Sequence, residues 1–219
     1  MKKIIIVVTA LFVLSTGLYP MVWGNGICRT ALASGGCGGL VQSAIRGGSS
    51  DMSIAELEVL AASSFFQSQQ DYKGVLGLVE RSKQVSDTKT FENKLTAVNS
   101  SIECTIASYQ KIFREIETLE KNESISYSLQ MFDYKRFCEE NELIPSIFEK
   151  VEELFKESPE SVCWYMIDKM NEIKNQLEDM KTTLKKGLPI EIEKVWKVNQ
   201  LFNKLDLFGQ YVAMVMASI

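Results

Sequence analysis

An unbroken apolar repeat in the middle of the chain constrains the fold more than any other feature of the sequence. Between residues 91 and 119, mostly apolar residues recur in alternating steps of four and three. The positions are Phe91, Leu95, Val98, Ile102, Thr105, Tyr109, Ile112, Ile116 and Leu119. A mean spacing of 3.5 residues places them on one face of a long helix, as in a coiled coil. Ile106 and Phe113 widen this face, which favours a bundle of several helices over a two-stranded coil.

A second repeat of the same kind occupies the segment from residue 163 to residue 184. Its members are Cys163, Met166, Met170, Ile173, Leu177, Met180 and Leu184. Ser158 and Pro159 before it predict a capping residue followed by proline in the first helical position. Gly187 after it predicts a left-handed residue that ends the helix.

The remaining segments beyond residue 52 also have helical periodicity, and none has the pattern of a strand. We predict further helices from Ser53 to about Ser86, from Ile125 to Ile144, from Pro145 to about residue 157, and from Ile192 to the end of the sequence. Gly74 and Gly77 predict a bend or a close helix crossing in the first of these. The predicted fold is all-α: an elongated up-and-down bundle of five or six antiparallel helices with coiled-coil-like seams.

The first 24 residues have the parts of a secretory signal. Lys2 and Lys3 precede an apolar run from Ile4 to Leu14, and Gly24 offers a small residue at a cleavage site. The alternative is an uncleaved anchor, because residues 4–23 are uncharged and nearly long enough to span a bilayer. Both interpretations place the body of the protein outside the cytoplasm. We predict three parts: a signal or anchor (1–24), a linker rich in glycine and cysteine (25–52) and a helical domain (53–219).

The five cysteines predict disulfides if the protein is exported. Cys28 and Cys37 could close a short loop in the linker; lipid attachment at Cys37 is the alternative. Cys104 and Cys138 stand at similar distances from the turn predicted near residue 122, so an antiparallel hairpin would bring them to one level. Cys163 occupies a position of the second repeat and is predicted to be a core residue. Pairing of Cys138 with Cys163 is the competing arrangement.

No catalytic signature is found in the sequence. The chain has no histidine, which removes serine–histidine and cysteine–histidine nucleophile pairs. Ser108 and Lys111 match the spacing of a serine–lysine pair, but a solvated pair on a helix is the stronger interpretation. The net charge of −4 is mixed along the chain, which argues against nucleic acid as a partner. We predict no enzymatic activity, no cofactor and no metal site.

The last predicted helix has more apolar surface than one face of a bundle needs. We predict that it binds a protein partner or a second copy of the chain through these residues: Leu201, Leu205, Phe208, Val212 and Val215. Trp164 and Trp196 lie beside the repeats, where a tryptophan either edges the core or lines a cleft between helices.

These observations together predict an exported helical interaction or scaffold protein, for example a component of a surface or secretion assembly. Its partner is a protein or a second copy, with membrane contact through the N-terminal segment. Two alternatives stay open at this stage. One is a periplasmic sensor or small-ligand-binding bundle, and the other is a membrane-active or pore-forming protein.

Overall fold

The computed structural model describes residues 54–81, 88–118 and 123–219, and all the regular structure in these ranges is α-helical. Four helices are long: α5 (Ile54–Arg81), α6 (Thr88–Thr118), α10 (Pro159–Lys185) and α11 (Ile192–Ser218). Three short helices come between α6 and α10: α7 (Glu123–Met131), α8 (Tyr134–Glu140) and α9 (Pro145–Glu157). The all-α prediction is therefore confirmed for this part of the chain.

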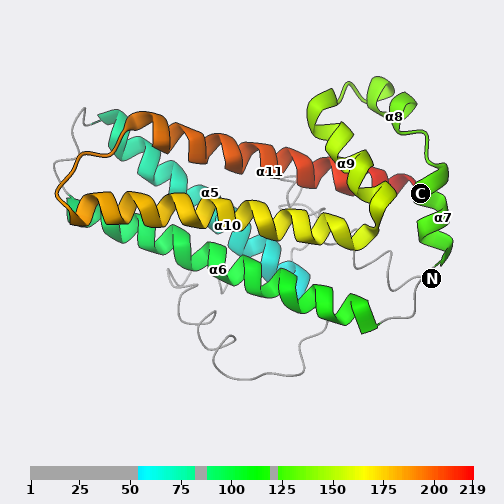
Figure 1. The fold of residues 1–219 in the computed structure, drawn as a ribbon, viewed down its shortest axis with the longest axis horizontal. Coiled ribbons are helices and arrows are strands. Elements are labelled where there is room, and N and C mark those ends of the chain that lie inside the picture. The colour runs from blue at the N-terminus through cyan, green and yellow to red at the C-terminus, as the bar shows by residue number, and fades with distance from the viewer. Residues whose placement is uncertain (1–53, 82–87, 119–122) are drawn as a thin grey trace, which may run out of the picture.

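The four long helices lie side by side and alternate in direction (Figure 1). α5 contacts α6, α6 contacts α10, α10 contacts α11, and α11 contacts α5. These contacts close a ring, which is the arrangement of an antiparallel four-helix bundle. The structure thus differs from the predicted five or six antiparallel helices, because the described residues give four bundle helices with three short ones at one end.

Pairs of contacts fix how α10 lies against its two neighbours. Phe113 of α6 packs on Trp164 of α10. Glu103, ten residues before Phe113 on α6, pairs with Lys174, ten residues after Trp164 on α10. The same relation holds between α10 and α11, where Tyr165 packs on Phe208 and Asp179 pairs with Lys194. Equal steps in opposite directions show that both helix pairs are antiparallel and keep one register over their length.

The two apolar repeats predicted from the sequence both face the interior of the bundle. Every member of the first repeat from residue 91 to residue 112 is buried, and so is every member of the second from residue 163 to residue 184. The last two members of the first repeat lie at positions of which no side chain is described. α5 continues through Gly74 and Gly77 without a break. At Gly74 an added Cβ would lie 3.1 Å from the Lys94 Nζ, so a side chain of α6 crosses there closely.

α11 packs against α5, α9 and α10. Phe202 at its centre packs against Phe65 and Tyr72 of α5, with ring centroids 6.0 and 5.4 Å apart. The Tyr72 hydroxyl donates a hydrogen bond to the Val195 carbonyl at 2.7 Å. Burial raises the pKa of Tyr72 above its usual range, so the hydroxyl stays protonated and able to donate this bond in alkaline solution as well as at neutral pH.

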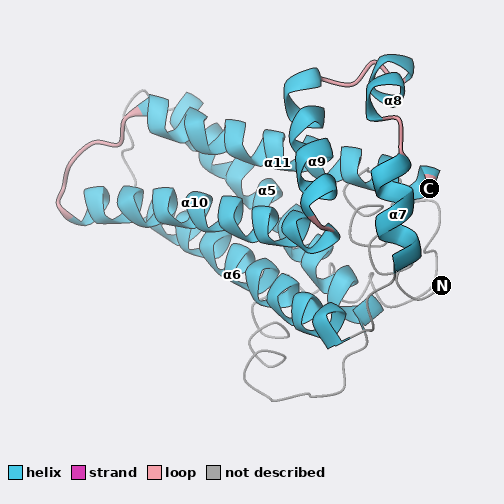
Figure 2. Cartoon of the chain, turned by 45° about the vertical axis from the view of Figure 1, so that its right-hand side comes forward, coloured by secondary structure: helices cyan, strands magenta, loops and turns pink. Residues whose placement is uncertain are grey.

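The short helices form an excursion at one end of the bundle (Figure 2). Phe148 of α9 lies at the centre of an aromatic cluster, and its ring is 6.1 Å from that of Tyr211 on α11. The Tyr211 hydroxyl accepts a hydrogen bond from the Ile144 amide at 3.0 Å. The other rings of the cluster are Phe132, Tyr134 and Phe137. The excursion is thereby attached to the last helix of the bundle.

The single helix predicted from residue 125 to residue 144 is interrupted in the structure. α7 ends at Met131 and α8 begins at Tyr134. Asp133 caps α8, and its carboxylate accepts a hydrogen bond from the Arg136 amide at 3.1 Å. The break also brings the rings of Phe132 and Tyr134 to 5.0 Å from each other within the cluster. The cap and the ring contacts outweigh the backbone hydrogen bonds that a continuous helix would keep.

Two predicted helix ends are confirmed. The Ser158 hydroxyl accepts a hydrogen bond from the Ser161 amide at the start of α10, with Pro159 in the first turn. Gly187 has a φ of 71° after the end of α10.

Residues 1–52, which include the predicted signal, the linker and Cys28 and Cys37, lie outside the described residues. Among the helices that are described, none is both long and apolar enough to cross a membrane.

Adjacent phenylalanines on α5 provide a test of this packing. Phe65 is 6 % exposed and contacts Phe202, whereas Phe66 is 50 % exposed. We expect Phe65→Ala to lower the free energy of unfolding by about 3–5 kcal/mol, because it leaves a cavity between α5 and α11. Phe66→Ala, the matched control, should cost less than about 1 kcal/mol. Denaturant unfolding followed by circular dichroism measures both; equal losses would show that α5 is rotated about its axis.

Candidate interaction surfaces

The residues predicted to bind a partner through the last helix lie mainly inside the bundle. Leu205, Phe208, Val212 and Val215 are all buried, and Leu201 is partly buried against the core. Phe208, for example, packs on Tyr165 of α10 with ring centroids 4.6 Å apart. The apolar breadth of this helix is therefore used within the chain, where three helices cover it. A surface for partners has to be sought among the exposed side chains.

The predicted cystine between Cys104 and Cys138 is not formed, and no disulfide joins the three cysteines in the described residues. The Cys104 sulfur lies 3.2 Å from the Ser64 hydroxyl, which donates to it from α5. Cys138 belongs to α8, and its thiol is directed to the Leu143 carbonyl at 3.7 Å. α7 and α8 do not continue antiparallel to α6, so the two sulfurs do not meet. Cys163 is buried in the core, as predicted.

The prediction that Ser108 and Lys111 form a solvated pair is wrong for Ser108, which lies in the packed interior. The Ser108 hydroxyl is buried and donates a hydrogen bond to the Cys104 carbonyl within its own helix at 2.9 Å, whereas Lys111 is exposed. A hydroxyl engaged in this way, with its lysine in solvent, does not form a nucleophile pair. The described residues also contain no group of cysteine, aspartate and glutamate side chains placed to hold a metal ion.

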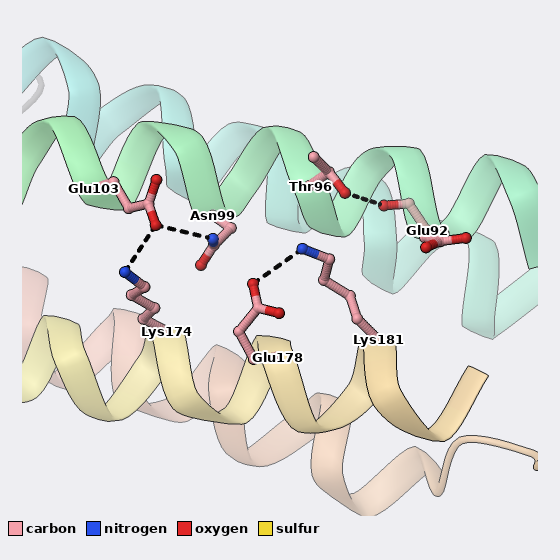
Figure 3. Close-up of polar contacts among 7 residues, drawn as sticks. All are labelled: Glu92, Thr96, Asn99, Glu103, Lys174, Glu178 and Lys181. Atoms are coloured by element: carbon pink, nitrogen blue, oxygen red, sulfur yellow. Dashed lines mark hydrogen bonds and ion pairs between the residues drawn. The ribbon is translucent and has the colours of Figure 1, made fainter. Parts of the chain in front are cut away.

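A band of polar side chains follows the line where α6 meets α10 (Figure 3). Glu103 pairs with Lys174 at 2.7 Å and accepts a hydrogen bond from the Asn99 amide nitrogen at 3.4 Å. Asn99 is buried, and its Oδ1 has no hydrogen-bond partner among the described residues. An orphaned buried oxygen costs about 1–3 kcal/mol, more than a half-exposed ion pair contributes. Such a band sets the register of two helices at some cost in stability.

Asp206 on α11 is a carboxylate held partly away from water. Burial raises its pKa, while a hydrogen bond from Gln210 at 3.1 Å and the charge of Lys73 on α5 act in the opposite direction. Perturbed carboxyl groups are common in functional sites. Here burial alone accounts for the raised pKa, and the two neighbours that oppose it, an amide and an ammonium group, stabilise the charged carboxylate as they would in a structural contact.

Exposed aromatic side chains are the remaining candidates. Trp164 on α10 is 52 % exposed, although its ring packs against Phe113 of α6 with centroids 4.7 Å apart. Trp196 on α11 is 44 % exposed and lies near the connection between α10 and α11. The sequence singled out both tryptophans, but it could not determine which of them would face solvent.

Comparisons with protein-family models, with curated proteins and with solved structures found no match for this chain.

The raised pKa of Asp206 predicts a pH-dependent stability difference. In the folded state the Asp206 carboxyl keeps its proton to a higher pH than in the unfolded chain, where its pKa is about 3.9. The free energy of unfolding therefore falls as the pH rises above about 3.9 and the carboxyl ionises. We expect Asp206→Asn to be more stable than the wild type at pH 7, and the difference to narrow as the pH falls below 4. Denaturant unfolding at several pH values measures it. A difference that is independent of pH would contradict the assignment.

The accessibility of the thiols gives a second prediction. Cys104 and Cys163 are buried, whereas Cys138 is partly exposed. Burial, together with the charges of Glu139, Glu149 and Glu152, raises the pKa of Cys138. Among these three thiols of the described residues, we expect iodoacetamide to label Cys138 first in the folded protein, and more slowly than a model thiol because the thiolate is scarce. Peptide mapping by mass spectrometry identifies the labelled site, and denaturant serves as the control that exposes all three thiols. A Cys104–Cys138 peptide in the unreduced map would contradict the structure.

Proposed function

We propose that the protein is an exported helical interaction protein without catalytic activity, and that it binds a protein partner through a surface centred on Trp164. The observation that carries the proposal is that the large aromatic side chain of Trp164 is 52 % exposed and at the same time packs against Phe113 of α6. Export is supported by the sequence of residues 1–24, with two lysines, an apolar run and a small residue.

The physical argument rests on how protein interfaces obtain their affinity. Tryptophan is among the residues that contribute most to binding, because it buries a large area at a small cost in conformational entropy. The ring of Trp164 packs against Phe113 of α6, and this contact restricts the ring before a partner arrives. Arg114 beside Phe113 in α6 and Asp168 one turn after Trp164 in α10 are both exposed. We call these four residues the Trp164 surface: an apolar centre with charged neighbours, as interfaces usually have.

The lack of histidine and the engaged hydroxyl of Ser108 support a role other than catalysis. The rigid register of α6 against α10 supports the same proposal, because the Trp164 surface is composed of residues from both helices. A change in this register would separate Phe113 from Trp164 and disassemble the surface.

Replacing Trp164 tests the proposal. A photoreactive phenylalanine analogue introduced at Asp168 should cross-link the protein to its partner in the cells that produce it. We expect Trp164→Ala to weaken binding by about 2 kcal/mol or more, roughly thirtyfold, and so to remove the cross-linked species. The measurement is gel separation followed by mass spectrometry, which also identifies a second copy of the chain as the partner if the adduct has twice the mass.

Trp196→Ala is the matched control, since it removes an equally exposed tryptophan from another part of the bundle. It should leave the cross-link unchanged. Both variants are compared with the wild type by circular dichroism so that a loss of folding is recognised. A cross-link that survives Trp164→Ala, or that is lost equally in Trp196→Ala, contradicts the proposed surface.

A further inference from the structure

The connection between α10 and α11 lies at the end of the bundle that is remote from α7–α9 (Figure 1). Large apolar side chains in and next to this connection are exposed. Leu188, Ile192 and Trp196 are 54 %, 50 % and 44 % exposed. Ile192 and Trp196 are four residues apart and share one face of α11, and Leu188 precedes them by the same step. Three large apolar side chains exposed together in one short segment are typical of a contact surface.

The backbone of this connection has a defined shape. The Gly187 amide donates to the Leu184 carbonyl at 2.8 Å, and the Leu188 amide donates to the Thr183 carbonyl at 3.1 Å. With the positive φ of Gly187, these bonds form a Schellman motif. In that motif the residue in the position of Leu188 usually packs against the preceding helical turn. Leu188 is exposed here instead, on a backbone whose shape these hydrogen bonds define.

Lysines border these apolar side chains. Residues 185–197 contain four lysines and two glutamates, in a chain whose net charge is −4. Lys194 is paired with Asp179 at 3.0 Å. The other three lysines of the segment are exposed: Lys185, Lys186 and Lys197. Glu191 and Glu193 are exposed as well, and the segment keeps an excess of positive charge.

We propose that residues 185–197, which we call the α10–α11 turn, bind the surface of an anionic lipid bilayer. Leu188, Ile192 and Trp196 would enter the interfacial region, where tryptophan is favoured because its ring is apolar and its N–H is polar. The exposed lysines complement the negative headgroups, and their long stems let the ammonium groups stay in water. A projecting end with apolar residues and positive charge fits a flat anionic surface better than it fits a groove. Such a contact is peripheral, since it combines a small apolar area with electrostatic attraction.

Tryptophan fluorescence in the full chain provides a direct test. The sequence has three tryptophans, so W23F/W164F leaves Trp196 as the only one, and W23F/W196F leaves Trp164. Vesicles of phosphatidylcholine and phosphatidylglycerol that contain brominated lipid should quench Trp196 and leave Trp164 largely unquenched. Vesicles of phosphatidylcholine alone should quench Trp196 much less. Quenching depends on contact between the indole and the bilayer, so it separates this turn from binding through the N-terminal segment.

Charge variants test the role of the lysines. We expect K185Q/K186Q to weaken partition into the anionic vesicles roughly twenty-five-fold, because each lysine near such a surface contributes about fivefold. The matched control K111Q/K135Q removes the same charge from exposed positions on α6 and α8 and should change partition by less than about threefold. L188S/I192S should weaken partition without changing the net charge.

Three results would overturn the proposal. The first is equal quenching of Trp164 and Trp196, and the second is an equal effect of K185Q/K186Q and K111Q/K135Q. The third is vesicle binding without any quenching of Trp196, which would assign the contact to another part of the chain. Circular dichroism of each variant checks that the helices are intact. Those substituted side chains that the structure describes are all exposed, so little change in stability is expected from them.

Discussion

The rest of the structure depends on how α11 buries an apolar surface that extends around most of the helix. One neighbouring helix covers a single stripe, so a surface of this width requires several neighbours. α5 covers the region around Phe202, α10 meets Phe208 through Tyr165, and α9 reaches Tyr211 through Phe148. The ring of four helices and the attachment of the excursion are both consequences of this requirement, and α11 is the element that they share.

The sequence predicts the parts of the fold that follow from local periodicity. The seams in α6 and α10 are buried wherever they are described, because a spacing of 3.5 residues specifies one face of a helix regardless of its partner. The caps at Ser158 and Gly187 are equally local. The break between α7 and α8 is not, because Asp133 can also occupy a helix interior. Asp133 lies at a capping position because the next residue, Tyr134, packs on Phe148 of α9, which in turn packs on Tyr211 of α11. Local sequence does not reveal these contacts.

The candidate site was less predictable for the same reason. The breadth of α11 indicates that it needs partners, but periodicity does not show whether they belong to the same chain. The cysteine prediction assumed that the chain returns along α6, whereas α7 and α8 leave that line and place Cys138 beside Leu143. Trp164 and Trp196 stand at the flanks of their helices, and only the arrangement in space decides which flanks remain uncovered. Along the bundle they are separated by about 20 Å, judged from the helical rise and the α10–α11 register, so two different contacts can be made independently.

Closure of the ring by α11 also determines the order in which the molecule can assemble. The bond between Tyr72 and Val195 joins residues 123 positions apart, so it cannot form until most of the chain has been synthesised. Before α11 emerges from the ribosome, Phe65 of α5 and Tyr165 of α10 lack the α11 rings that they pack against in the folded protein. Contacts of such long range slow folding, because the entropy cost of closing the loop precedes the favourable contact energy. The core of the bundle is therefore completed late in synthesis, when α11 becomes available to cover its neighbours.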